Sequence, residues 1–257
     1  MNIVLISAVL PVVVLQFFIY RKDKINPEPL GLLLLTFFAG CFSVVPAALM
    51  EAVIMPLAPP ADSAPVLNGL FDGYLVAGLS EELWKLLLLM LVVWRSRHFD
   101  EYFDGIVYAA YLSLGFACVE NISYVFSSTD AAGTALMRGL LAVPAHFLFG
   151  VTMGYYLSLA KFDPRGRRRH LLHALLFPLL LHGTYDALLM VSTNLSAGNG
   201  GGDAVVGILC AALFVIFIVF DIKLWRWGLK RIKKMQQRSH EQTFDRNNPF
   251  EGFQWNI

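Results

Sequence analysis

The chain has 257 residues, of which 57% are apolar and 15% are charged, and its formal net charge is +1. Its mean hydropathy is +0.60. This composition excludes an ordinary soluble domain, because stretches of about 20 apolar residues, the length that crosses a bilayer, recur along nearly the whole chain. We therefore predict an all-α polytopic membrane protein.

Seven apolar stretches are predicted to be transmembrane helices. They occupy residues 3–20, 31–57, 70–94, 105–126, 135–160, 170–192 and 204–222. The first is followed directly by RKDK and lacks a small-residue cleavage site, so we expect it to be retained. Residues 1–222 are predicted to form one membrane domain, and residues 223–257 a basic cytoplasmic segment and a tail.

Lysine and arginine are distributed unevenly between the loops. Alternate loops and the segment from Lys223 to Arg246 contain these residues, and the other loops contain none. The loops without them are residues 58–69, 127–134 and 193–203. Cytoplasmic loops are enriched in basic residues, so we predict the N-terminus outside and the C-terminus inside. Only Lys85 and Arg138 remain within the predicted spans.

The segment KLWRWGLKRIKK, residues 223–234, combines basic residues with two tryptophans. Such a stretch immediately after a transmembrane helix is typical of contact with anionic lipid, with the indole rings at the membrane interface. We therefore predict anionic lipid, and not nucleic acid, as its partner.

The third span contains SEELWKLL, which places Glu81, Glu82 and Lys85 inside an otherwise apolar run. A charge at the centre of a bilayer costs about 2.5–3.5 kcal/mol even on the lenient insertion scale, so such residues are expected to be functional. Glu81 and Lys85 lie four residues apart on one helix face and are predicted to pair. Glu82 points about 100° away and is predicted to be free.

The fourth and fifth spans also carry polar residues. GFACVENISY in the fourth contains Glu120 and Asn121, and PAHFLFGVTMGYY in the fifth contains His146, Gly150 and Gly154 at four-residue spacing. Each pattern alone is equally typical of helix packing, since small residues let helices approach closely and polar residues bond across them.

The sixth span contains LLLHGTYDALLM, where His182 and Asp186 lie four residues apart on one face. A carboxylate one turn away fixes the imidazole tautomer and leaves the other ring nitrogen for a substrate, a water or a metal. From the helical rise, the polar residues of spans three to six share a depth displaced toward the outside. We predict that they form one site.

Four motifs occur in order between residues 70 and 190. EELWK fits EExxK, FACVEN fits FxxxEN, His146 precedes a glycine four residues on, and HGTYD fits HxxxD. Together they resemble the PrsW family of intramembrane proteases, within the superfamily of the CAAX prenyl endopeptidases and the bacteriocin-processing enzymes. The CAAX enzymes have a histidine where this chain has Glu120, so the resemblance is to the PrsW branch.

The resemblance implies a protease of the bacterial cytoplasmic membrane that cuts a single-span membrane protein near the external surface, as in the first cut of an anti-sigma factor. Peptide hydrolysis needs a base that activates water and donors that stabilise the oxyanion. We predict Glu81 or Glu82 as the base, with Lys85 holding the glutamate pair. The other predicted site residues orient water, donate to the oxyanion or complete the polar cavity: Glu120, Asn121, His146, His182 and Asp186.

A glutamate mechanism without a metal is favoured, because HExxH is absent and a Glu-Glu-Lys cluster has little to do in a zinc-only site. A zinc-dependent protease stays open. In that case the ligands are expected among His146, His182, Glu120 and Asp186.

Two functions outside proteolysis also stay open. One is a membrane scaffold resembling the anterior-pharynx-defective subunit of gamma-secretase, although the paired glutamates favour an enzyme. The other is a proton-coupled transporter with carboxylates as a proton relay. The sequence shows no convincing internal repeat of the kind that many transporters have.

Overall fold

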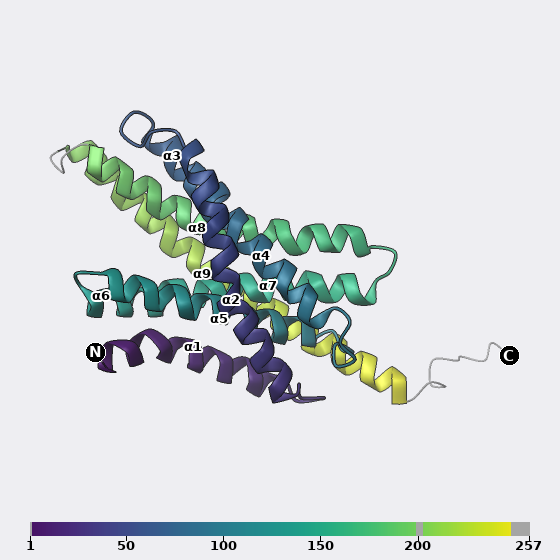
Figure 1. The fold of residues 1–257 in the computed structure, drawn as a ribbon. Coiled ribbons are helices and arrows are strands. Elements are labelled where there is room, and N and C mark those ends of the chain that lie inside the picture. The colour runs from purple at the N-terminus through teal and green to yellow at the C-terminus, as the bar shows by residue number, and fades with distance from the viewer. Residues whose placement is uncertain (1, 199–202, 248–257) are drawn as a thin grey trace.

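The computed structural model describes residues 2–198 and 203–247, and all regular structure in them is helical (Figure 1). The segments are α1 (Asn2–Lys22), α2 (Leu30–Ile54), η1 (Met55–Leu57), α3 (Pro65–Phe71), η2 (Asp72–Leu79), α4 (Ser80–Val93), α5 (Asp104–Ser127), α6 (Ala131–Met137), η3 (Arg138–Ala142), α7 (Val143–Phe162), α8 (Arg167–Gly198) and α9 (Ala204–Asn247). The prediction of an all-α membrane protein is confirmed.

The described residues form seven helical runs, because α2 and η1 are continuous, as are α3, η2 and α4, and α6, η3 and α7. Six runs are long and apolar enough to cross a membrane. The run from Pro65 to Val93 is the exception, because it holds four charged side chains. These are Asp72, Glu81, Glu82 and Lys85.

α5 and α7 form the centre of the bundle. In the most apolar stretch of α5, 83% of the residues are buried, against 6% in that of α9. A Cβ at Gly150 on α7 would lie 2.8 Å from the carbonyl oxygen of Ala109 on α5, and Gly154 faces the backbone of Gly105. The predicted small-residue stripe is therefore confirmed, and it holds His146 of α7 close to α5.

A second close contact joins η2 to α8. A Cβ at Gly73 would lie 2.6 Å from the backbone nitrogen of Ala187, and one at Gly78 would lie 3.3 Å from that of Gly183. η2 is a π-helical segment, a form that is frequent at functional sites, and it ends directly before Ser80 and the two glutamates. The glycines thus bring the EExxK helix against the HxxxD helix.

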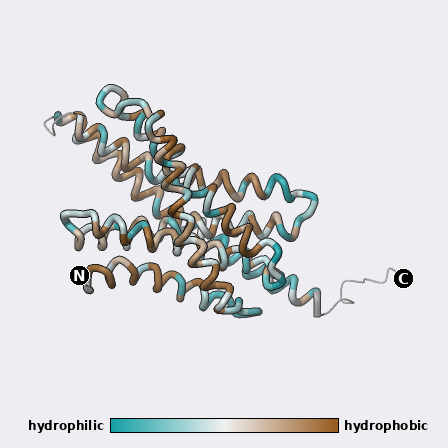
Figure 2. The backbone as a smooth tube through the Cα atoms, viewed as in Figure 1, coloured by the Kyte–Doolittle hydropathy of each residue, from teal (hydrophilic) through white to brown (hydrophobic). Residues whose placement is uncertain are grey.

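The basic loops gather at one end of the bundle, where Figure 2 shows hydrophilic residues at the α7–α8 hairpin and along the last part of α9. α9 continues past residue 222 without a break. Its C-terminal half packs on these loops, since Gln236 bonds the carbonyl oxygen of Lys22 and Ser239 accepts from the backbone nitrogen of Phe103. The tail from residue 248 lies outside the described residues.

Candidate active site

Lys85 of α4 is the centre of a fully enclosed cluster. Its Nζ lies 3.0 Å from Glu81 Oε2 and 2.8 Å from Glu82 Oε1, and its side chain has no exposed surface. The prediction that Glu82 is free is wrong, because one long lysine side chain reaches the carboxylates three and four residues before it. The ammonium group also lies 3.9 Å from the centre of the Phe116 ring.

The two histidines join this cluster from α7 and α8. His146 Nδ1 lies 3.2 Å from Lys85 Nζ, and its Nε2 lies 2.8 Å from Glu120 Oε2. Since Lys85 is a donor only, His146 accepts at Nδ1 and donates from Nε2 to Glu120. The rings of His146 and His182 lie 5.1 Å apart, so the motif residues do meet in space.

His182 bonds a carboxylate through each ring nitrogen. Its Nε2 lies 3.0 Å from Asp186 Oδ2, and its Nδ1 lies 2.9 Å from Glu82 Oε1. The predicted contact with Asp186 is present. The second nitrogen is not open, contrary to the prediction, because the close contact of η2 with α8 places Glu82 against it.

Glu120 and Asn121 of α5 have different roles in the structure. Glu120 Oε2 accepts from His146 and, at 2.8 Å, from Arg138. Asn121 is buried one residue further along, where it donates to the carbonyl oxygen of Ala8 on α1 and accepts from Arg138 Nε. The prediction that Asn121 lines the polar cavity is wrong, since it faces α1 and holds Arg138 from behind.

Two cavities flank the cluster. The first, of about 220 Å³, lies between α7, α8 and α9, and both histidines border it. The second, of about 270 Å³, lies between α2, η2, α5 and α8, and Glu81 borders it. Glu120, Arg138 and Asp186 border both. The apolar walls of the first cavity include Leu141, Phe149, Tyr185, Leu189, Phe214 and Phe217.

Both cavities lie toward the end of the bundle opposite the basic loops. The second is bordered by Met55 just after the end of α2, by Asp72 at the start of η2 and by Tyr124 near the end of α5. Under the predicted orientation, this is the external end.

Three charged residues at the cavities are absent from the predicted site. Arg138 stands out in the sequence as one of two basic residues within the spans. Glu51 of α2 borders the second cavity and has no hydrogen bond or ion pair within the described part of the chain, and Asp72 borders the same cavity with its buried Oδ1 unpartnered. The cost of a charge in a membrane could have indicated Glu51, which lies within the second apolar stretch.

Four residues form a group with metal-binding chemistry. One donor atom from each of Glu81, Glu82, His146 and His182 lies within 4.8 Å of the others. Two imidazoles and two carboxylates are ligands that suit zinc. The expected set with Glu120 and Asp186 is different, because these carboxylates bond the imidazole nitrogens on the far side of the rings.

Lys85 limits how this group can hold a metal. Its ammonium already lies within 3.2 Å of donor atoms of Glu81, Glu82 and His146. A metal ion fits the donor chemistry of the group, but it needs the lysine side chain to turn away. The ammonium and a metal ion would therefore compete for the same carboxylates.

Comparisons with known proteins identify the family to which the sequence belongs. Residues 28–220 match the family described as PrsW family intramembrane metalloprotease. The chain is 40% identical over 240 residues to Protease PrsW of Geobacillus kaustophilus strain HTA426, covering 93% of this chain and 95% of the relative. It is 33% identical over 249 residues to Protease PrsW of Clostridioides difficile strain 630, covering 92% and 93%.

A third relative is Protease PrsW of Bacillus subtilis strain 168, which is 34% identical over 230 residues and covers 89% of this chain and 93% of the relative. No solved structure matches the chain. Both the family model and these relatives extend across all four motifs. The chain therefore belongs to the PrsW family of intramembrane proteases.

Proposed function

We propose that this protein hydrolyses a peptide bond of a single-span membrane protein near the external membrane surface, with a water activated by a glutamate. One observation carries this proposal: Glu81 is held by Lys85 and at the same time borders a cavity of about 270 Å³. A buried carboxylate with a fixed geometry and space for water beside it is the arrangement that a general base needs.

Glu81 is the better base of the two glutamates. Glu82 is fully buried, and its Oε1 is shared between Lys85 and His182. Glu81 has one oxygen on Lys85 and a side chain at the cavity wall. Glu82 therefore positions Lys85 and His182, and Glu81 takes the proton from water.

Arg138 is our choice for stabilising the oxyanion. It borders both cavities, and its Nε and one terminal nitrogen bond Asn121 and Glu120. A guanidinium has five N–H donors, so further donors are left for a developing negative charge. The Nε2–H group of His146, which donates to Glu120 in this structure, also borders the first cavity.

The two cavities suggest how substrate and water are separated. The first has walls of leucine and aromatic side chains, which suit an apolar substrate segment, and the second is bordered by several carboxylates, which suit water. Their position toward the external end supports a cut near that surface. An anti-sigma factor is one substrate of this kind.

A zinc-dependent reaction is the second candidate, favoured by the family description and by the group of Glu81, Glu82, His146 and His182. In that case these four side chains would hold the ion, which would activate a bound water and act as a Lewis acid. Glu120 and Asp186 then orient the two imidazoles from behind, as carboxylates do in zinc sites.

Co-expression with a tagged library of single-span membrane proteins tests the proposed reaction. We expect external fragments with wild type and with Glu241→Gln, an exposed control of equal charge change, and none with Glu81→Gln. Mass spectrometry of the new termini locates the cut. Fragments that persist with Glu81→Gln would remove Glu81 as the base, and a cut in the cytoplasmic half of the substrate helix would refute the external site.

A further inference from the structure

A groove of about 440 Å³ lies between α7, α8 and α9, and none of the predicted site residues borders it. Its lining combines aromatic and basic side chains and contains no carboxylate. The residues are Tyr155, Tyr156, Phe177, Leu181, Trp227, Lys230, Arg231 and Lys234. Within the described residues, none of the three cations forms an ion pair, so the groove presents an uncompensated positive charge.

The basic side of the groove is organised by contacts with α7. Arg231 Nη1 lies 3.3 Å from Thr152 Oγ1. Arg231 and Lys234 lie 5.8 Å and 5.7 Å from the centre of the Tyr155 ring, within the range of cation–π attraction. Lys230 and Lys234 are exposed. The cations are thus gathered within one turn of helix and partly fixed before any ligand binds.

The other side of the groove is apolar. The Tyr156 ring stacks on Phe177, with ring centres 4.9 Å apart and an angle of 11° between the planes, and Leu181 follows one turn further along α8. α8 runs away from the basic end of the bundle, whereas α9 runs toward it. The apolar floor therefore lies deeper in the membrane than the three cations.

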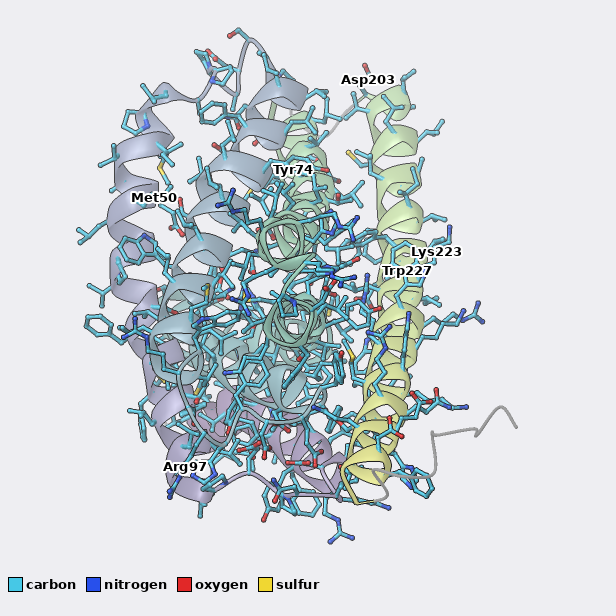
Figure 3. The ribbon with its side chains drawn as sticks, turned by 90° about the vertical axis from the view of Figure 1, so that its right-hand side faces the viewer. Met50, Tyr74, Arg97, Asp203, Lys223 and Trp227 are labelled. Atoms are coloured by element: carbon cyan, nitrogen blue, oxygen red, sulfur yellow. The ribbon has the colours of Figure 1, made fainter. Side chains whose placement is uncertain are left out.

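We propose that this groove binds one anionic glycerophospholipid of the leaflet that faces the basic loops. Its phosphate lies against Lys230, Arg231 and Lys234, and one acyl chain lies along Phe177 and Leu181. Figure 3 shows α9 along one edge of the molecule, with Trp227 partway along it, where a lipid has access from the side. Tryptophan and tyrosine at this level are typical of the headgroup region.

The apolar floor selects a lipid over other anions. A soluble phosphate or an acidic peptide would account for the cations, but neither would cover Phe177 and Leu181. The sequence predicts lipid contact for residues 223–234 in general. The groove restricts the predicted lipid contact to three of these basic residues. It also adds contacts from side chains of α7 and α8 that the sequence does not indicate.

Native mass spectrometry of the purified full chain tests the site. Dioleoyl phosphatidylglycerol and dioleoyl phosphatidylcholine are added in equal amounts, and their bound fractions are compared. For wild type we expect a preference for phosphatidylglycerol of about tenfold or more, since basic residues near an anionic headgroup attract it. We expect the triple variant Lys230→Gln, Arg231→Gln, Lys234→Gln to lose it.

The matched control is Arg165→Gln, Arg168→Gln, Arg169→Gln, which removes the same charge from exposed positions outside the groove. We expect this control to keep the wild-type preference. An equal loss in both triple variants would show attraction to the basic face as a whole and would overturn the proposal. So would a wild type without preference.

A second measurement needs no variant. Phosphatidylglycerol with a photoreactive acyl chain is bound to wild type, and the crosslinked peptides are identified. We expect labelling to concentrate on the peptides around Tyr156, Phe177 and Leu181. Labelling spread evenly over α1, α2 and α8 would contradict a specific lipid-binding site in the groove. Neither measurement depends on proteolysis, so its outcome is separate from that of the proposed function.

Discussion

Two groups of buried or half-buried carboxyl groups occupy different levels of the bundle, and their polar partners differ in kind. The central group bonds lysine, arginine and histidine, and its members are Glu81, Glu82, Glu120 and Asp186. The group at the basic end consists of Asp23, Glu28 and Asp104, which are at most 6% exposed. Within the described residues, none of these three pairs with a cation.

The carboxyl groups at the basic end bond the backbone and a phenol. Asp23 accepts from the backbone nitrogen of Glu28, Glu28 accepts from the Tyr108 hydroxyl, and Asp104 accepts from two backbone nitrogens in the loop before α5. Burial raises the pKa of Asp23 to about 6 and that of Glu28 to about 7. The hydrogen bonds of these groups close the loops at the basic end.

Under the proposed function, a buried carboxyl group does not by itself mark an active site. The central group combines carboxylates with ammonium and guanidinium partners, imidazoles that can carry protons, and cavities on two sides. The carboxyl groups at the basic end have bonds that fix loop geometry. The combination of a carboxylate, a cation and a cavity is what distinguishes a candidate catalytic site from a structural group of carboxyls.

The largest effect is expected from removing the central cation. Lys85→Met leaves two buried carboxylates without their shared partner, which costs about 3–5 kcal/mol of stability. Thermal unfolding in detergent and the yield of folded protein measure this loss. Lys223→Met, an exposed control, is expected to change stability by less than about 0.5 kcal/mol. A stable Lys85→Met protein would mean that the cluster does not depend on its cation.

The next effect separates the two groups by activity. Glu81→Gln is expected to lower fragment formation by about 10²–10⁴-fold, the usual contribution of a general base. Glu28→Gln keeps the carboxyl shape in the other group and is expected to leave cleavage within about twofold of wild type. Quantified fragments from equal amounts of folded protein give both ratios. Similar losses of fragment formation in the two variants would mean that the two carboxyl groups do not differ in their role in cleavage.

A smaller effect is a pH-dependent stability that comes from the basic end. Because the folded-state pKa values of Asp23 and Glu28 are raised, their contribution is complete below the ordinary values near 4 and is lost as the pH rises through about 6–7. We expect stability to fall over this window by about 1.4 kcal/mol for each unit by which the folded-state pKa is raised. Unfolding temperatures from pH 4.5 to 8 measure it. Glu28→Gln should flatten the curve, and an unchanged slope would contradict the assignment.

The smallest effect is expected at Glu51, which borders the second cavity and, within the described residues, forms no hydrogen bond or ion pair with the central group. Glu51→Gln removes a charge from the water-facing wall, so we expect about a fivefold reduction in cleavage or less, equivalent to about 1 kcal/mol. Stability should stay the same. A loss as large as that of Glu81→Gln would place Glu51 in the reaction itself.

The sequence predicted the helices and the meeting of the four motifs, because apolar length and charges within spans are signals that each segment carries alone. It also predicted that Lys85 holds the glutamate pair, but not that Glu82 closes His182 Nδ1. The Glu82–His182 contact depends on how η2 packs on α8, through glycines whose spacing in π-helical backbone differs from that in an α-helix. Asn121 was misplaced for a related reason, since one residue along α5 separates the side facing His146 from the side facing α1.

The central claim is that the Lys85 ammonium, and not a metal ion, is the cation held by Glu81, Glu82 and His146 during catalysis. Metal analysis of purified protein that cleaves a substrate, before and after treatment with a chelator, tests it most directly. We predict well below one metal ion per chain and cleavage that the chelator does not change. One zinc ion per chain, lost together with activity and restored with it on adding zinc back, would contradict the claim.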